Sequence, residues 1–438
     1  MQTSLENTGA LARRLTVNID ASQIEQKINK KLQELARTMR LDGFRPGKVP
    51  LPVVNKRFRE PVRGEVLEEL VKTSFEEAVG KSTERLAHQP HIEFKQNVDG
   101  QPLEYIATFD VMPTIEQINF SGLTLEKPVA DISASDLAKR VEQLQRRFAT
   151  WEKVERAAAK GDKLTIALKA TLNGEEVEEV SADELSVDLG GNELLAGFDE
   201  LLIGAKPNDA INKPFTFPAE HANKLIAGQT LQLAIQIKEV QEAKLPELNE
   251  ELFTKLHVEE KTQAALEDKL KDAINKEIAR AQFIQLKKQL FKFLNDANPI
   301  HVPASLVANQ EKQLREQVQQ RLQGTDISAE NLNEDLEKQL LVQAEQTVRV
   351  SLLLGKYIQD NQLVADAARV NERLMNMLMP YAMRDQALFR QLLDSPMPKQ
   401  IAQDEVLEEV AIEHIAQTVA TPVEKTFSLE ELLALPAA

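Results

Sequence analysis

Hydrophobic and polar residues follow regular patterns over the N-terminal part of the chain. Apolar and polar residues alternate from Leu11 to Ile19, which is typical of a half-buried strand. Apolar residues then recur at helical spacing from Ile24 to Met39 and again from Val66 to Val79, and alternation returns from Leu103 to Met112. We therefore predict an α+β domain over residues 1–112.

The next two segments change in character. Residues 113–150 are predicted to be a linker with a short strand at 123–125 and a helix at 135–148 that packs with the C-terminal domain. Residues 151–245 are predicted to form a small antiparallel sheet around one short helix. Apolar and polar residues alternate at Lys163–Leu172, 185–189 and 231–237, which predicts strands, and Asn173-Gly174 predicts a hairpin turn. The short helix is predicted at 193–199 and is closed by Gly204.

The remainder, residues 246–438, is predicted to be helical. Long apolar stripes recur at three- and four-residue spacing, and Gly324 and Gly355 are its only two glycines. No heptad repeat persists beyond a few turns, so we expect helical arms rather than a coiled coil. The predicted fold class is α+β multidomain, with an N-terminal α+β domain, a small antiparallel sheet domain and an extended all-α C-terminal domain with arms.

Composition excludes several protein classes. The 438 residues include no cysteine, so a disulfide framework and a thiolate metal site are excluded. No apolar run approaches the roughly 18 residues of a membrane span, and the first residues lack the pattern of a signal peptide. We expect a cytoplasmic protein that does not enter a membrane.

Charge is unevenly distributed along the chain. Residues 27–63 hold eleven Lys and Arg against three Asp and Glu, a formal charge of +8, whereas the whole chain carries -16. Such a distribution favours docking on an anionic surface by one end only. The alternative is that these cations lie along solvated helix faces.

The most informative motif is Gly-Phe-Arg-Pro-Gly-Lys-Val-Pro at residues 43–50. Its glycines and prolines predict a tight exposed loop between two helices, and that loop carries Phe44, Arg45 and Lys48. One apolar anchor with two cations beside it suits an anionic, grooved surface such as ribosomal RNA beside a ribosomal protein. Taken alone, the loop could equally be a solvated turn that closes a helical hairpin.

This motif, together with Leu41-Asp42 before it, resembles the ribosome-docking signature of the bacterial trigger factor family. Further resemblance lies in Ile300-His301-Val302-Pro303-Ala304 and in 352–356. The resemblance implies a chaperone whose partners are the large ribosomal subunit near the exit tunnel and nascent or unfolded polypeptides. Pro46 departs from the family pattern, where a cation is frequent. The residues implied in ribosome binding are Gly43, Phe44, Arg45, Gly47 and Lys48.

The segment 151–245 is similar to an FKBP-type prolyl isomerase domain. Prolyl isomerisation needs an apolar, water-poor pocket rather than a nucleophile, because its barrier of roughly 20 kcal/mol arises from amide resonance. The resemblance implies a pocket at Phe198 with Leu194 and Leu195 beside it. At three positions where the family has aromatic residues, this chain has Leu168, His221 and Leu233. We therefore expect weak isomerase activity; ordinary core packing is the other interpretation of Phe198.

Five of the eight methionines lie within 23 residues, from Met375 to Met397. Methionine is flexible and polarizable, and surfaces that accept unrelated apolar partners use it heavily. These residues are also compatible with a helix core. The residues predicted to contact clients are Met375, Met377, Leu378, Met379, Met383 and Phe389.

Nucleotide and metal sites are not predicted. Gly80-Lys81-Ser82 resembles the end of a phosphate-binding loop, but the required earlier glycine is Phe75, so we interpret it as a helix terminus. The six histidines show no ligand spacing, which predicts no metal and no other cofactor. Chaperone activity would then be independent of ATP.

Two functions from different classes remain. The first is a ribosome-docked chaperone that shields apolar nascent segments with its helical arms, and the second is primarily a prolyl isomerase acting on proline-containing folding intermediates. A general RNA-binding protein is disfavoured by the isoelectric point near 5.1. Homodimer formation is left open.

Overall fold

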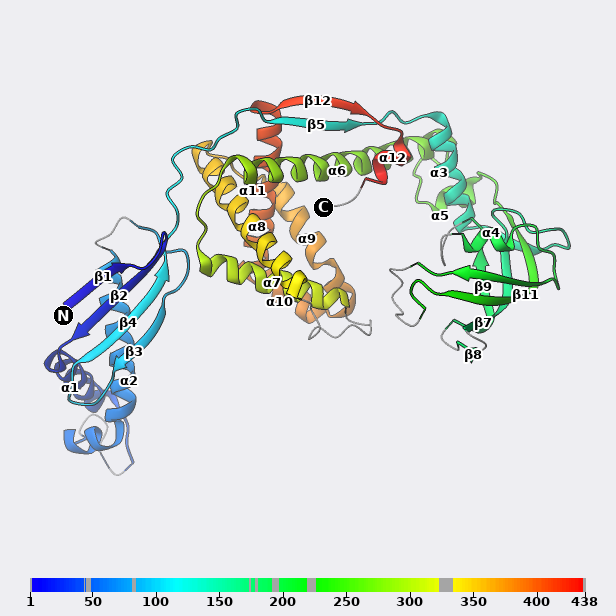
Figure 1. Cartoon of the computed structure of the whole chain (residues 1–438). Coiled ribbons are helices and arrows are strands. Elements are labelled where there is room, and N and C mark those ends of the chain that lie inside the picture. Colours follow the sequence, from blue (N-terminus) through cyan, green and yellow to red (C-terminus); the bar gives the residue numbers. More distant parts are fainter. Residues whose placement is uncertain are drawn as a thin grey trace. The chain divides into compact units, whose positions relative to one another are not determined.

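The computed structural model describes residues 2–42, 44, 49–80, 84–172, 175–177, 180–190, 197–218, 226–322 and 334–435 (Figure 1). The chain divides into two compact units. The first contains the described residues of 1–125, 289–323 and 328–421, and the second contains those of 126–288 and 422–438. Each unit is built from segments that are distant in the sequence.

The N-terminal module of the first unit contains an antiparallel sheet with strand order β1-β2-β4-β3. Its strands are β1 (Gln2–Asn7), β2 (Ala12–Ile19), β3 (His91–Gln96) and β4 (Leu103–Asp110). Strand alternation places Leu15, Val17 and Tyr105 on one buried face, as period-two patterning requires.

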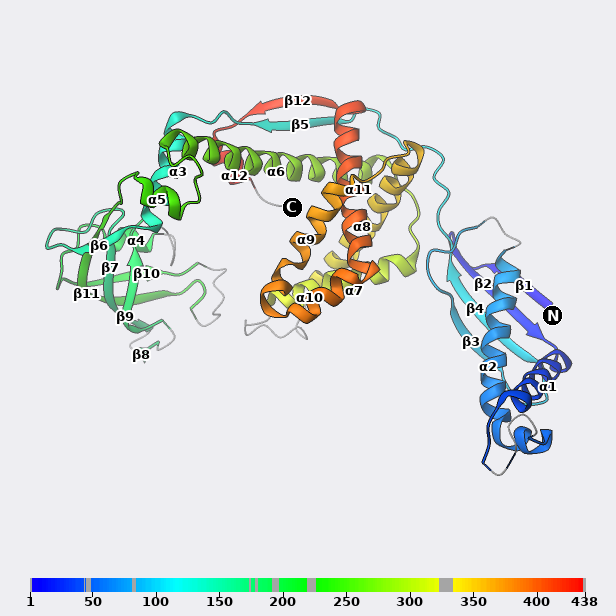
Figure 2. The same cartoon turned by 180° about the vertical axis from the view of Figure 1, so that it is seen from behind.

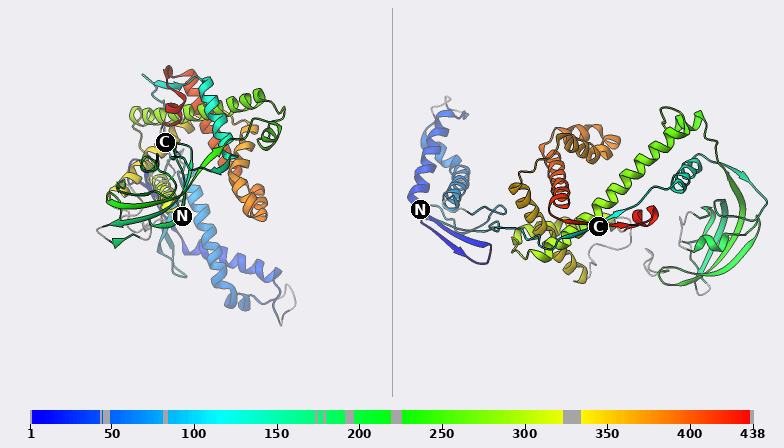
Figure 3. Two further views of the ribbon diagram at one scale, coloured as in Figure 1. Left: turned by 90° about the vertical axis from the view of Figure 1, so that its right-hand side faces the viewer. Right: turned by 90° about the horizontal axis from the view of Figure 1, so that it is seen from above.

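Two helices, α1 (Ala21–Thr38) and α2 (Leu51–Val79), lie on one side of this sheet (Figures 2 and 3). Ile24, Ile28 and Leu32 of α1 share one hydrophobic cluster with the buried face of the sheet. The buried Tyr105 hydroxyl is 2.7 Å from the Ser74 hydroxyl of α2, which satisfies both polar groups inside the core. The two helices are therefore fixed to the packed sheet.

Two hydrophobic clusters of described residues connect helices in the helical body of the first unit. One joins α7 (Ala304–Leu322) to α8 (Glu334–Asp360) through Val307, Ala344 and Val348. The other joins α9 (Ala367–Arg384), α10 (Gln386–Asp394) and α11 (Pro396–Thr418). The long helix α6 (Gln263–Ala297) contributes its C-terminal end to this unit.

The second unit contains an antiparallel sheet with strand order β10-β11-β7-β8. Strand β6 also pairs with β11, and β9 also pairs with β7. Its inner face is lined by alternating apolar residues of β7 and β11, which form one hydrophobic cluster with the short helix α4. The elements are β6 (Thr150–Lys153), β7 (Lys163–Leu172), β8 (Glu175–Glu176), β9 (Ala182–Asp188), α4 (Phe198–Leu202), β10 (Ala210–Thr216) and β11 (Thr230–Lys244).

Helices before and after this sheet, and the C-terminal segment, complete the unit. The helix α3 (Ala134–Arg147) begins with a capping box between Ser133 and Asp136. Strand β5 (Thr124–Val129) pairs with β12 (Thr421–Thr426). Helices α5 (Glu250–Lys255) and α12 (Leu429–Leu433) are short, and Leu429 and Leu432 of α12 pack on Ile274 and Ile278 of α6.

The predicted α+β multidomain class is confirmed, with antiparallel sheets and a long helical C-terminal region. Strand β5 extends to Val129, beyond the predicted 123–125, because it gains a partner from the far end of the chain. The turn at 173–174 and residues 193–196 of the predicted short helix lie outside the described residues. In the part of the chain that the structure covers, no helix is long and apolar enough to cross a bilayer.

Candidate functional sites

The predicted docking loop lies between the end of α1 at Thr38 and the start of α2 at Leu51. Phe44 is 38% exposed, and its backbone N–H donates to the Leu41 carbonyl at 3.0 Å. Val49 and Val54 are buried in the module core and anchor the chain where it enters α2. Gly43, Arg45, Gly47 and Lys48 lie outside the described residues.

The basic patch of residues 27–63 divides into two groups. Lys27 pairs with Glu69 at 3.1 Å and Lys31 pairs with Glu65 at 2.8 Å, both across α1 and α2. The hydrogen bond to Glu65 is the main reason that the pKa of Lys31 is raised. Part of the formal charge of this segment is therefore neutralised inside the module.

Arg59 ties α2 to the rest of the module. It pairs with Glu25 at 2.5 Å and with Asp99 in the β3–β4 turn at 3.1 Å. Hydrogen bonds to Asp99 and Glu25 raise the pKa of Arg59, and the reciprocal bond lowers the pKa of Asp99. This arginine is a structural tie between elements.

The second group of cations is exposed. Arg37 and Arg40 lie at the C-terminal end of α1 and just beyond it, and Lys56 and Arg57 lie in the first two turns of α2. None of the four is ion-paired to a carboxylate of the described residues. Arg57 does lie 5.9 Å from the centroid of the neighbouring Phe58 ring.

The predicted prolyl pocket maps onto the hydrophobic cluster of the six-stranded sheet. Phe198 at the start of α4 is 3% exposed and shares this cluster with Leu168 of β7 and Leu233 of β11. The structure thus brings together three of the six predicted pocket residues. Leu194, Leu195 and His221 lie outside the described residues.

Two further aromatic rings extend this cluster. The Phe198 ring meets Phe215 edge-to-face with centroids 5.9 Å apart, and Phe215 meets Phe217 in the same way at 5.3 Å. Phe215 lies on β10 opposite Leu231 of β11, so its side chain shares the inner face of the sheet. Phe198 and Phe217 are buried whereas Phe215 is half-buried, which leaves part of its ring accessible.

The predicted client residues separate into an exposed and a packed group. Met375, Met379 and Met383 follow one another at four-residue spacing along α9 and are exposed, Met383 by 87%. Met397, at the start of α11, is 70% exposed. By contrast, Met377, Leu378 and Phe389 pack in the cluster between α9, α10 and α11.

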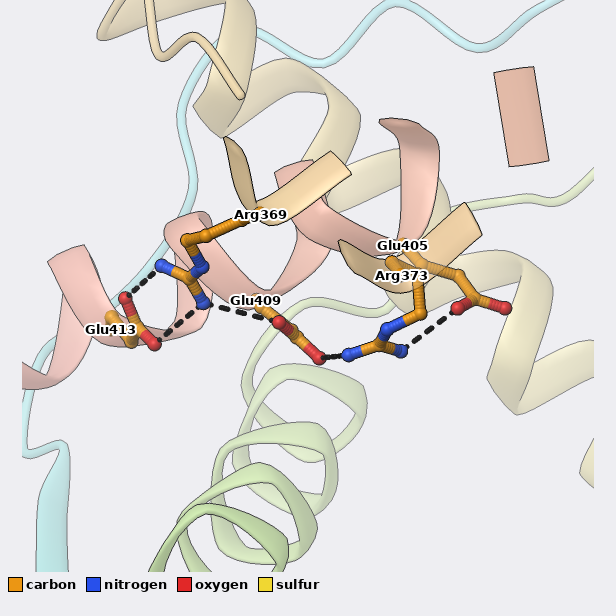
Figure 4. Close-up of polar contacts among 5 residues, drawn as sticks. All are labelled: Arg369, Arg373, Glu405, Glu409 and Glu413. Carbon is orange, nitrogen blue, oxygen red and sulfur yellow. Dashed lines mark hydrogen bonds and ion pairs between the residues drawn. The ribbon is translucent and has the colours of Figure 1, made fainter. Parts of the chain in front are cut away.

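An ion-pair ladder joins the other end of α9 to α11 (Figure 4). Arg369 contacts both carboxylate oxygens of Glu413 at 3.0 Å and reaches Glu409 at 3.1 Å. Arg373 contacts Glu409 and, at 2.9 Å, Glu405. The hydrogen bond to Glu413 is the main reason that the pKa of Arg369 is raised. The ladder joins the N-terminal half of α9 to α11, whereas Met379 and Met383 lie towards the C-terminal end of α9.

Comparisons with known proteins identify the family of this chain. A family model described as "Bacterial trigger factor protein (TF)" matches residues 1–144, and one described as "Bacterial trigger factor protein (TF) C-terminus" matches residues 262–417. The trigger factor of Marinobacter nauticus is 32% identical to this chain, over 98% of each chain. The chain belongs to the trigger factor family.

Other trigger factors show the same extent of similarity. That of Alkalilimnicola ehrlichii is 34% identical over 99% of this chain and 95% of its own length, and that of Pseudomonas paraeruginosa is 33% identical over 98% of both. A chain of the solved structure "Promiscuous Substrate Recognition in Folding and Assembly Activities of the Trigger Factor Chaperone" is 16% identical, with a TM-score of 0.43 over 96% of this chain and 100% of that chain. The family assignment depends on the sequence relatives. This chain is therefore a member of a chaperone family.

For this trigger factor family member, sequence patterns located the loop, the sheet core and the methionine segment but missed two features. Phe215 and Phe217 were missed because they lie on β10 and directly after it, and that strand was not predicted. Alternation of Ile211, Lys213 and Phe215 is too irregular to signal it. The ladder was also missed, although arginines at 369 and 373 and glutamates at 405, 409 and 413 recur every four residues, a spacing that marks one helix face.

Proposed function

We propose that this protein is an ATP-independent, ribosome-associated chaperone of the cytoplasm. In this proposal the Gly43–Lys48 loop docks on the large ribosomal subunit near the exit tunnel, and the C-terminal helices bind nascent and unfolded polypeptides. We also propose that residues 1–112 form the ribosome-binding domain, 113–150 a linker, 151–245 the prolyl isomerase-like domain and 246–438 the helical client-binding domain. No cofactor or metal is required, and homodimer formation stays a prediction that sedimentation velocity would test.

One observation carries the docking proposal. Phe44 is exposed at the tip of two helices that are fixed to a sheet, and the adjoining helix ends carry exposed cations. An apolar ring supplies contact area that is independent of salt, and cations supply attraction to phosphate that falls as salt rises. Both are needed by a tip that must recognise an RNA–protein surface rather than RNA in general.

The test compares co-sedimentation with ribosomes for the unmodified chain and for a variant with Phe44→Ala, Arg45→Ala and Lys48→Ala. We expect the variant to lose ribosome binding and to keep its fold, because exposed loop substitutions shift stability by less than about 0.5 kcal/mol. A matched control replaces Phe94, Lys95 and Lys72, an exposed phenylalanine and two exposed lysines elsewhere in the module, with alanine. Equal binding of both variants would refute docking by the loop.

Client binding is supported by the exposed methionines of α9 and α11. Unbranched thioether side chains adapt to apolar segments of different shape, which suits a protein that binds many clients. The surface should therefore suppress aggregation of an unfolded client without ATP and without requiring proline in its sequence. Failure with a proline-free client would favour the isomerase function instead.

Prolyl isomerase activity is the second candidate function. It is favoured by the apolar cluster that joins Phe198 to Leu168 and Leu233, and by the half-buried ring of Phe215. Such a cluster excludes water and so suits a twisted imide. We propose a weak activity, because leucines at 168 and 233 lack the ring faces that an aromatic wall provides.

A further inference from the structure

In the N-terminal module, several cations on α1 and α2 that lie far from the 43–50 loop form ion pairs, whereas described cations close to the loop do not. In the middle of α1, Lys27 and Lys31 are neutralised by Glu69 and Glu65 of α2. Towards the loop, Arg37 and Arg40 are exposed and have no such partner among the described residues. Lys30, farther from the loop on α1, is exposed and unpaired among the described residues as well, but at the helix end next to the loop neither described cation has a carboxylate partner.

The same change occurs along α2 in the opposite chain direction. Arg59 and Arg63, farther from the loop, both contact Asp99, and Arg59 also contacts Glu25. Lys56 and Arg57, closer to the loop, are exposed and reach no carboxylate that the structure describes. The guanidinium carbon of Arg57 lies 5.9 Å from the centroid of the neighbouring Phe58 ring.

Acidic residues are present near the loop but do not neutralise these cations. Glu34, Asp42 and Glu60 are exposed, and none forms an ion pair with a described cation. The four cations therefore outnumber the local carboxylates. Their side chains are long and flexible, which allows each to reach an anion near its own helix end.

We propose that Arg37, Arg40, Lys56 and Arg57 bind backbone phosphates of ribosomal RNA on the two flanks of the Phe44 loop. This inference rests on the proposed ribosome docking and assigns its electrostatic part to the helix ends. Unpaired cations on two separate elements match a phosphate backbone, which presents anions at regular short intervals, better than the scattered carboxylates of a protein surface. The paired lysines of α1 are assigned no RNA contact.

The experiment measures the affinity of the full-length protein for ribosomes as a function of salt concentration. Two variants each remove two of the four cations that we assign to RNA, and we call them rim variants. One is Arg37→Gln with Arg40→Gln, and the other is Lys56→Gln with Arg57→Gln. The matched control is Lys27→Gln with Lys31→Gln, which removes the same charge from the same helix α1. Circular dichroism and thermal melting verify that each variant is folded.

Each phosphate contact contributes about 0.7 to 0.9 to the slope of log affinity against log salt. Each rim variant should therefore lower the slope by about 1.5, so that between about 50 and about 200 mM salt it loses roughly eightfold less affinity than the unmodified protein. The control should keep the original slope. Arg37→Lys with Arg40→Lys should restore it, since charge rather than planar geometry makes a simple phosphate contact.

Three results would overturn the inference. Rim variants that weaken binding at every salt concentration without a change of slope would show contact with a ribosomal protein instead of RNA. Rim variants that bind as the unmodified protein does would show that these cations stay solvated, and a control that lowers the slope equally would show that only total charge matters. If the loop variant of Phe44, Arg45 and Lys48 binds ribosomes normally, the docking proposal itself fails, which separates the two outcomes.

Discussion

Glu409 of α11 lies between Arg369 and Arg373 of α9 and contacts both guanidinium groups, Arg369 at 3.1 Å. One carboxylate thereby joins two successive turns of α9 to α11. Hydrogen bonds to Glu409 and Glu405 outweigh partial burial and raise the pKa of Arg373. The ladder thus holds the N-terminal half of α9 against α11.

Replacing Glu409 should loosen this helix pair. Glu409→Gln removes the charge that two arginines share, and we expect a loss of about 1 kcal/mol in local stability, since networks exceed isolated surface pairs. Amide hydrogen exchange of α9 and α11 at neutral pH measures the loss. Glu372→Gln is the control, because Glu372 is exposed on α9 without an ion pair to any described residue. Unchanged exchange in Glu409→Gln would show that apolar packing alone holds the helices.

Polar substitution of the methionine stripe should weaken client binding. We expect Met375→Gln, Met379→Gln and Met383→Gln together to reduce suppression of aggregation severalfold, because the apolar area offered to the client is lost while the packed side of α9 is untouched. The assay follows light scattering of an unfolded proline-free client without ATP. Met112→Gln, Val364→Gln and Val423→Gln, three exposed apolar residues elsewhere, form the control. Equal loss in both variants would refute a specific stripe.

Isomerase activity should depend on the ring cluster. Phe198→Ala and Phe215→Ala should each lower kcat/KM for a proline tetrapeptide by up to about tenfold, since a ring contact contributes about 0.5 to 1.5 kcal/mol. Phe148→Ala, which removes an exposed ring outside the cluster, should have no effect. Leu168→Phe, Leu233→Phe and His221→Tyr together should raise activity. Activity that is insensitive to Phe198→Ala would show that the pocket lies elsewhere.

Acid should destabilise the sheet of the second unit through Asp162. Burial alone would raise the pKa of this carboxyl, but hydrogen bonds from Arg156 and the Ala159 backbone outweigh burial and hold the pKa below its ordinary value. The resulting stabilisation is complete above the unfolded pKa of about 3.9 and is lost as pH falls through the folded pKa. Asp162→Asn should lose about 1 to 2 kcal/mol at neutral pH.

The single tryptophan, Trp151, lies on β6 of the same sheet and reports its unfolding. Urea midpoints from its fluorescence should fall more steeply below about pH 4 in the unmodified protein than in Asp162→Asn. Other carboxylates titrate in both proteins, so the difference between them isolates Asp162. Identical pH dependence would show that the Arg156 pair contributes no net stability.

Local patterns in the sequence determined much of this protein. The recurrence of Ile24, Ile28 and later apolar residues indicated α1, and alternation at Leu103–Met112 indicated β4, because helix and strand periods are set by backbone geometry alone. The 43–50 motif indicated the family, which full-length relatives confirm. Such features depend on residues that are close in the chain.

Features that require distant segments were decided by the tertiary structure. The number of cations in residues 27–63 can be read from the sequence. Which of them are paired depends on the packing of α1 on α2, which brings Glu65 to Lys31 and leaves Arg37 without a carboxylate among the described residues. Likewise, Leu378 and Met379 are neighbours with similar hydrophobicity, yet only the first faces α11. Burial and ion pairing depend on which elements meet, and that is fixed by long-range packing rather than by local periodicity.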